Sequence, residues 1–477
     1  MKGDKSHVTV TRGKFAAIAA AAVTAALLAP ASVRSQTTCT VTTPGDTGPG
    51  TLRAHLANPV CAVIDFGFSG SIGILSPLTI NRDVTIKGWL SSPERNLYPT
   101  QFTLIQAARV FEVTQGATVV ISGIAFYRNR ASLAGGAIVN SGNLTVTYSD
   151  FVDNEVTPAI DPELGVDRSI GGAIYNTSSG SLTVTHSWFA FNVSDQGSAI
   201  YNNGTLTVIN STFFQNASRG GMAGTIFNAG HLTLTNSTIN DNLGYGLWLS
   251  QGSLRSKNSI VAGNDGGDCL SVEASLSIEG VNLATDATCP QFRRVTPTEL
   301  GLDADPPVTA LLDGSVAIDA VADCTLHDGE MPVATDGRGF ARPQGAFCDV
   351  GAFEFVRPFT VAGPFAPLDI DALHVVKAGQ AVAVKFSLGG DRGLGVLVPG
   401  FPSSQETDCD VSSFSNVIDE TAAAGNSGLS YDLSTDTYTY VWKTERAWRD
   451  TCRQLTLMFA DGRWLNGSAL RANFSFK

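Results

Sequence analysis

One stretch of the chain gathers acidic side chains densely enough to do chemistry. It runs from residue 150 to 168 and carries, besides Glu155, the following catalytic candidates: Asp150, Asp153, Asp161, Glu163, Asp167 and Arg168. Carboxylate oxygens are the ligands that Ca²⁺ prefers in proteins, and a basic side chain beside them can take a proton from a substrate carbon. The stretch is therefore compatible with a calcium-dependent polysaccharide lyase, with calcium as the one cofactor expected.

The same stretch also has the marks of a solvated loop. Pro158 and Pro162 interrupt it, and prolines are typical of turns and excursions. If the repeats described below align, Asp153 and Asp195 flank one groove. We favour the loop interpretation, under which the chain has no catalytic residue, no metal site and no cofactor.

The rest of the sequence holds no familiar catalytic motif. Gly-x-Ser-x-Gly, P-loop, His-Glu-x-x-His and Cys-x-x-Cys patterns are absent, and the histidines have no metal-ligand spacing. Tryptophan rings can stack on sugar rings, but packing in the core or at corners is the favoured interpretation of the six tryptophans. They are Trp89, Trp188, Trp248, Trp442, Trp448 and Trp464.

A repeated pattern surrounds the acidic stretch and must position it. Leu-Thr-aliphatic units begin at residues 144, 182, 206 and 232, so the steps are 38, 24 and 26 residues. A Gly-Gly-Ala-Ile-x-Asn motif or a variant of it precedes each unit, and a turn that ends in Asn follows each one. The acidic stretch is the insertion that lengthens the 38-residue step.

The repeat predicts a parallel β-helix. Its strands have three to five residues, alternate with period two and are bounded by Gly, Asn and Ser. Strands this short bury their apolar face only if each coil stacks on the next. Two columns of asparagines should then form structural amide ladders, at residues 140, 176, 202 and 228 and at residues 154, 192, 216 and 242.

Charge and composition exclude some partners. The chain has 31 Lys and Arg against 43 Asp and Glu, a net charge of −12. Such an acidic chain lacks the basic footprint that nucleic acids and anionic membranes require. We expect neither as a partner.

The N-terminus predicts export. Lys2, Arg12 and Lys14 precede an apolar run over residues 15–28, and Ala29-Pro30-Ala31 resembles a signal-peptidase site. We expect residues 1–31 to be a signal peptide. The run is too short to span a membrane, so we expect no membrane span in the mature chain.

Eight cysteines agree with an oxidising compartment. Their order along the chain favours four local disulfides: Cys39 with Cys61, Cys269 with Cys289, Cys324 with Cys348, and Cys409 with Cys452.

Several motifs resemble known families. The paired Gly-Gly-Ala-Ile and Phe-x-x-Asn repeats resemble those of polymorphic outer-membrane proteins, whose relatives are adhesive. Residues 314–320, 336–342 and 348–354 resemble the end of a choice-of-anchor Q domain. The first resemblance implies an exported right-handed β-helix, and neither brings catalytic residues. From the residues themselves, an ion-pair cluster is expected among Asp336, Arg338, Arg342, Asp349 and Glu354.

A composition break follows residue 355. Residues 356–370 are rich in proline, which is typical of a linker, and residues 371–477 alternate as in a small antiparallel β-sandwich. Residues 376–390, 438–443 and 452–455 resemble the PxKF domain of secreted bacterial proteins. Ala383 stands where that family has its name-giving proline.

We therefore predict an all-β protein of two domains. A capped right-handed parallel β-helix of pectate-lyase-like fold covers residues 35–355, and the sandwich follows the linker. The favoured function is a monomeric, secreted or cell-surface, adhesin-like scaffold for an extended polysaccharide or another surface ligand. Two alternatives stay open: a polysaccharide lyase or glycoside hydrolase, and a structural component of the envelope.

Overall fold

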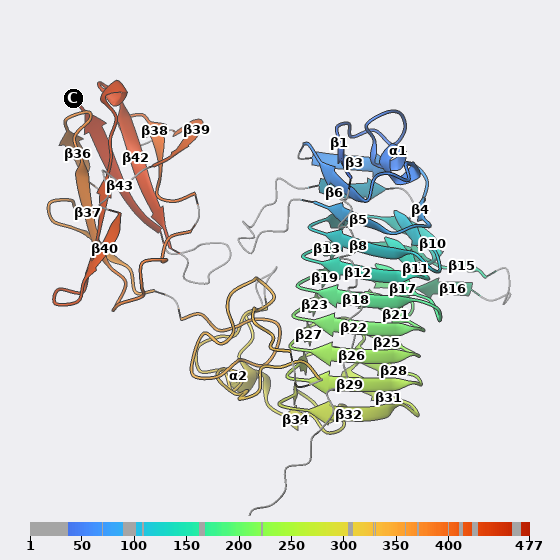
Figure 1. The fold of residues 1–477 in the computed structure, drawn as a ribbon. Coiled ribbons are helices and arrows are strands. Elements are labelled where there is room, and N and C mark those ends of the chain that lie inside the picture. The colour runs from blue at the N-terminus through green and yellow to red at the C-terminus, as the bar shows by residue number, and fades with distance from the viewer. Residues whose placement is uncertain are drawn as a thin grey trace, which may run out of the picture. The chain divides into compact units, whose positions relative to one another are not determined.

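The structure is a computed structural model, and Figure 1 shows its fold. It describes residues 37–68, 70–88, 102–106, 109–161, 167–220, 223–303, 309–327, 329, 331–357, 359–369, 372–398, 400–409, 414–421, 428–459 and 469–477. The predicted signal peptide, Trp89, Glu163 and Trp464 lie outside these residues. No helix among the described residues is long and apolar enough to cross a bilayer.

The first part of the chain forms a parallel β-helix, as predicted. One of its two ten-stranded sheets, sheet A, has the order β1 (Thr38–Val41), β2 (Val63–Phe66), β5 (Val84–Lys87), β8 (Thr118–Ser122), β12 (Asn143–Thr147), β18 (Ser181–Thr185), β22 (Thr205–Ile209), β26 (His231–Thr235), β29 (Ser253–Lys257) and β32 (Ser275–Glu279). Every neighbouring pair is parallel, and the Leu-Thr-aliphatic units lie in register on successive rungs.

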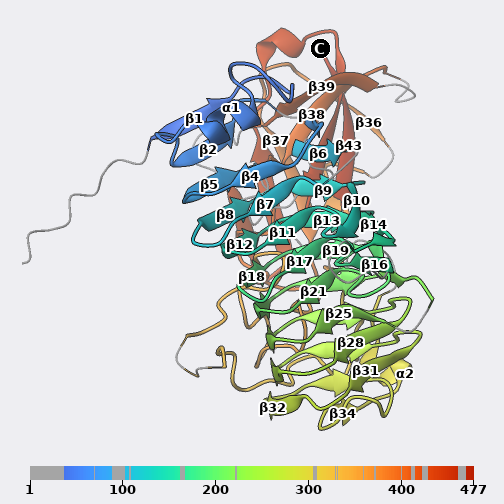
Figure 2. The same cartoon turned by 90° about the vertical axis from the view of Figure 1, so that its right-hand side faces the viewer.

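Two further sheets run beside sheet A. Sheet B has the order β3 (Gly70–Ile74), β6 (Phe102–Gln106), β9 (Ala125–Tyr127), β13 (Asp150–Val152), β19 (Trp188–Ala190), β23 (Thr212–Phe214), β27 (Thr238–Asn240), β30 (Ile260–Ala262), β33 (Leu283–Ala284) and β34 (Arg293–Arg294). Sheet C, which faces the viewer in Figure 2, contains β4 (Leu78–Ile80), β7 (Phe111–Val113), β11 (Ile138–Asn140), β17 (Ile174–Asn176), β21 (Ile200–Asn202), β25 (Gly224–Asn228), β28 (Tyr245–Leu249) and β31 (Gly267–Ser271).

A short sheet D joins sheets B and C. It contains β10 (Arg130–Ala134), β14 (Glu155–Thr157), β15 (Ala159–Ile160), β16 (Asp167–Ile170), β20 (Val193–Ser194) and β24 (Ala217–Ser218). The insertion forms β15 and β16, which pair antiparallel, in contrast to the other strands of this sheet.

Period-two alternation builds the core of the coil. In β12, Leu144 and Val146 are buried and the residues beside them face outward. On sheet B, four buried phenylalanines stack on successive rungs at centroid distances of 4.6, 4.5 and 4.7 Å: Phe126, Phe151, Phe189 and Phe213. Offset aromatic stacking adds to the area that each ring buries.

Asparagine ladders lock the corners, as predicted. At the corner between sheets B and D, each Nδ2 donates to the Oδ1 of the next rung at 2.7, 2.9, 2.8, 3.0 and 2.8 Å, along Asn129, Asn154, Asn192, Asn216, Asn242 and Asn264. The second ladder links Asn140, Asn176, Asn202 and Asn228 at 2.8, 2.7 and 2.6 Å. All these amides are buried.

The N-terminal rung carries a short helix, α1 (Leu52–Ala57). Thr51 caps it by accepting a hydrogen bond from Ala54 N at 3.2 Å. Arg82 donates to four carbonyls at and after the helix end, those of His55, Leu56, Asn58 and Cys61. The carbonyls of His55 and Leu56 belong to the last turn of the helix, whose carbonyls lack partners within the helix.

Residues 309–357, which we call the side segment, follow the short helix α2 (Pro297–Leu300) and contain no extended strand among the described residues. They lie against the corner between sheets A and B. Lys257 Nζ donates to Asp323 Oδ2 at 2.8 Å, and Asn210 Nδ2 donates to Thr335 O at 2.7 Å.

The C-terminal residues form two small sheets around one core, which includes the buried side chains of Trp442, Tyr438, Phe386 and Phe474. The sheets are β35 (Ala362–Phe365), β37 (Val382–Ser387), β41 (Thr437–Trp442) and β40 (Leu429–Asp432), and β36 (Leu373–Val376), β43 (Ala469–Phe476), β42 (Cys452–Met458), β38 (Ser403–Thr407) and β39 (Phe414–Glu420). They are antiparallel as predicted, except that β36 pairs parallel with β43.

All four predicted disulfides are formed. They join Cys39 to Cys61, Cys269 to Cys289, Cys324 to Cys348, and Cys409 to Cys452.

Replacing Asn216 with Ala should destabilise the β-helix by on the order of 3 kcal/mol, because the backbone N–H and Nδ2 of Asn192 and the carbonyl of Phe189 would lose buried partners. Thermal and denaturant unfolding measure the change. Thr207→Ala, on the outer face of sheet A, is the matched control and should shift stability by less than about 0.5 kcal/mol. Equal shifts in the two variants would contradict the ladder's role.

Candidate functional site

Three acids named in the sequence analysis, Asp153, Glu155 and Asp195, form an ion-pair network. Their partners are Arg128, Arg130 and Arg219. Asp153 Oδ2 meets Arg128 Nε and Asp153 Oδ1 meets Arg130 Nη2, both at 3.0 Å. Glu155 Oε2 lies 3.0 Å from Arg130 Nε, and its other oxygen pairs with Arg219. Arg219 also lies 3.7 Å from Asp195.

The sheet register creates this network. Arg130 and Glu155 are opposite each other in β10 and β14, one rung apart. Three arginines therefore alternate with three acids and cancel their charge. A calcium ion at Asp153 or Glu155 would have to displace an arginine from every carboxylate oxygen, which disfavours these acids as a metal site.

The other predicted acids are not brought into this network. Asp150 lies in β13, in register with Ala125 and Trp188, and Asp161 is buried. Asp167 and Arg168 belong to β16. The conjectured pair of Asp153 and Asp195 does share one surface, joined through Glu155 and the two arginines that pair with it.

Among the described residues, one group has the proximity of metal ligands, namely Cys39, His55 and Cys61. Its cysteines form a disulfide, so they offer no thiolate.

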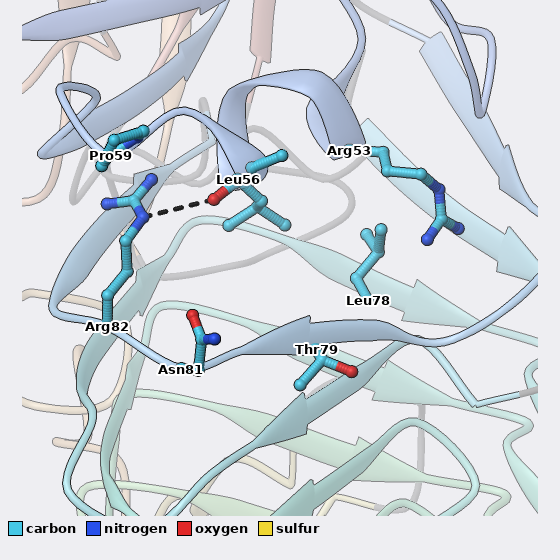
Figure 3. Close-up of a pocket in the computed structure, with 8 residues that line it drawn as sticks. Arg53, Leu56, Pro59, Leu78, Thr79, Asn81 and Arg82 are labelled. Carbon is cyan, nitrogen blue, oxygen red and sulfur yellow. Dashed lines mark hydrogen bonds between the residues drawn. The ribbon is translucent and has the colours of Figure 1, made fainter.

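A cavity of about 390 Å³ lies between α1 and β4 (Figure 3). Arg53 and Arg82 flank it. Arg53 pairs with Asp46 at 2.8 Å and donates to the carbonyls of Ser76 and Pro77, whereas Arg82 serves the carbonyls near the helix end. Because their donors are directed at these groups, the arginines support the N-terminal rung and leave little for a ligand.

The ion-pair cluster expected in the side segment is formed. Asp336 pairs with Arg338 at 2.6 Å, and Arg342 pairs with Glu354. Asp349 accepts from Asp319 N at 2.7 Å and from Phe355 N. Burial, with a smaller contribution from the charge of Glu354, raises the pKa of Asp349 to about 7. All these side chains are buried, so the cluster is a structural core rather than an accessible site.

The outward face of sheet C carries a different feature, which we call the aromatic column. Tyr175, Tyr201, Phe227 and Trp248 occupy the same position on four successive rungs. The ring centroids are 5.7, 4.6 and 5.7 Å apart, and the middle pair is stacked. Tyr175, Tyr201 and Trp248 are partly exposed, and Phe227 is 6% exposed.

The local sequence dictates this placement. In the triplet Ile200-Tyr201-Asn202, Ile200 is buried in the core and Asn202 is buried in the second ladder, so the residue between them points outward. Glycines keep the neighbouring chain close. A Cβ at Gly224 would come within 2.7 Å of the Cβ of Trp248.

Polar side chains border the column where the chain leaves sheet C for sheet A. Asn203 Nδ2 lies 3.4 Å from the hydroxyl of Tyr175, and Thr177 Oγ1 donates to Ser141 Oγ at 3.1 Å. Repeated flat rings bordered by hydroxyls and amides have the chemistry of a carbohydrate-binding surface.

Packing in the core or at a corner was the favoured interpretation of Trp248, which instead lies partly exposed on sheet C, and sequence reasoning did not single out Tyr175, Tyr201 or Phe227. The missed signal is the middle residue of the Ile-x-Asn triplets, which period-two alternation places outside. Trp442 is a core residue, as favoured, and Trp448 is partly buried against the sandwich core.

Part of the chain matches a known protein family. The family described as right handed beta helix region matches residues 103–225, which is about a quarter of the 477 residues. This span includes Tyr175, Tyr201 and the whole ion-pair network. The match and the parallel sheets together define a right-handed parallel β-helix. The chain has no significant match among curated proteins.

The buried Asp349 should make stability depend on pH. Its folded pKa of about 7 lies above the ordinary value of 3.8, so the protonated form favours folding. This contribution is complete below about pH 4 and is lost as pH rises through about 7, by up to about 4 kcal/mol.

Thermal unfolding at several pH values across this window tests the expectation. Asp349→Asn should reduce the fall in melting temperature. Asp313→Asn, at an exposed position in the same segment, should leave it unchanged. Identical pH profiles for all three proteins would contradict the assignment.

Proposed function

We propose that this protein is an exported binding scaffold whose β-helix holds an extended polysaccharide along the aromatic column. The observation that carries the proposal is the alignment of four rings on consecutive rungs of sheet C, of which Tyr175, Tyr201 and Trp248 are partly exposed. The apolar face of a sugar ring buries its area well against an aromatic ring.

The length of the column suits a polymer rather than a single sugar. Rungs repeat at about 4.8 Å, so four rings cover about 14 Å. Several sugar units of one chain can contact successive rings, and linked weak contacts add up through effective concentration.

Four disulfides support export, because such bonds persist in oxidising compartments. In this proposal the C-terminal sandwich is the predicted PxKF-like domain and residues 1–31 are removed as a signal peptide. Secretion or display at the cell surface would bring the column to its ligand.

The lyase alternative is less well supported, because the carboxylates of Asp153 and Glu155 are both held by arginines. A structural role in the envelope would not require an accessible aromatic column, so the column favours the binding proposal over this alternative.

Trp248→Ala should weaken binding about tenfold to any polysaccharide that the native protein binds, because losing one aromatic contact costs about 1 kcal/mol or more. Tyr201→Ala should act in the same direction. Affinity electrophoresis over a panel of polysaccharides, with tryptophan fluorescence as a second readout, gives the dissociation constants. Thr207→Ala on sheet A is the control. Retained affinity in both aromatic variants would refute the proposed site.

Asp153→Asn with Glu155→Gln separates binding from catalysis. Under the binding proposal, the double variant should keep its affinity and lose only about 1 kcal/mol of stability per weakened surface ion pair. No unsaturated product should appear with either protein, with or without calcium. Turnover by the native chain that the double variant lacks would establish the lyase alternative instead.

A further inference from the structure

The surroundings of the aromatic column are almost free of charge. From residue 169 to residue 254 the sequence contains only three charged side chains other than histidine: Asp195, Arg219 and Asp241. This span supplies all four rings of the column. We expect a surface with so few charges to discriminate between charged and uncharged polymers.

The one arginine of this span is already engaged. Arg219 pairs with Glu155 and Asp195, and its Nη1 donates to Val156 O at 2.6 Å. At the end of the column near β7, Glu112 is in turn paired with Arg109. Among the described residues of these rungs, every basic side chain near sheet C therefore has an acidic partner.

The border of the column toward sheet A offers neutral groups instead. The connecting turns at residues 176–181, 202–205, 228–231 and 249–253 contain no Lys, Arg, Asp or Glu. They present Thr177, Ser179, Asn203, Ser250 and Gln251. Hydroxyls and amides both donate and accept, so they match the hydroxyl groups of a sugar.

We infer that the polymer bound along the aromatic column is an uncharged polysaccharide. This inference rests on the proposed function and names its ligand class. An anionic polysaccharide would place a carboxylate or sulfate on successive units, and the described residues along the rings hold no unpaired guanidinium or ammonium for it. The net charge of −12 would also repel such a polymer. A cationic polymer would likewise find no Asp or Glu in the connecting turns that border the rings.

The test uses the mature chain with soluble polymers of three charge classes. The neutral ones are a β-glucan, a mannan and a xylan, the anionic one is polygalacturonate, and the cationic one is chitosan. We expect a neutral polymer to bind, with a dissociation constant that changes less than about twofold between about 0.1 M and about 1 M salt. Trp248→Ala should weaken this binding about tenfold. Arg219→Gln should leave it unchanged, because the arginine pairs with acids and not with the ligand.

The outcomes distinguish this inference from the proposed function. Binding of polygalacturonate that needs Trp248 and Arg219 and weakens with salt would refute the inference that the ligand is uncharged. It would still support the aromatic column as the binding site. Binding of chitosan that needs Trp248 would do the same. A chain that retains no polymer of any charge would overturn the proposed function itself, and the inference with it.

Discussion

The β-helix and the surfaces that it presents depend on rungs that stack without slipping. The corner amides enforce this, because each buried asparagine donates to the same atom of the next rung. Sheet residues alternate between core and surface, so a slip of one residue would exchange the two faces. The stacked phenylalanines inside and the aromatic column outside are both consequences of one register.

The coil could be predicted because its information is local and repeated. Strand length, Gly corners and the Ile-x-Asn triplets recur at nearly constant steps, apart from the insertion. Each cysteine also pairs with the next cysteine along the chain. The parallel pairing of β36 with β43 could not be predicted, because it joins segments about a hundred residues apart whose patterns fit either direction equally. The path of the side segment along the corner between sheets A and B likewise rests on single contacts, such as that of Asn210 with Thr335.

The candidate site was predicted less well than the fold. The acids of the insertion attracted attention as a cluster in sequence, but their partners Arg130 and Arg219 come from other rungs, so only the register reveals that Glu155 is neutralised. The aromatic column had a readable signal in the triplets. The residue type of a single tryptophan does not show whether it faces outward, whereas the middle position of the triplet does.

The triplet arrangement has a consequence for how such a surface changes over generations. Tyr175, Tyr201 and Phe227 recur every 26 residues, and each coil brings its own ring, its own ladder asparagine and its own core aliphatic. Duplication or loss of one whole coil would lengthen or shorten the row of rings while leaving every corner intact. The reach of this surface along a polymer can therefore evolve by copying units, with no need to redesign the contacts within them.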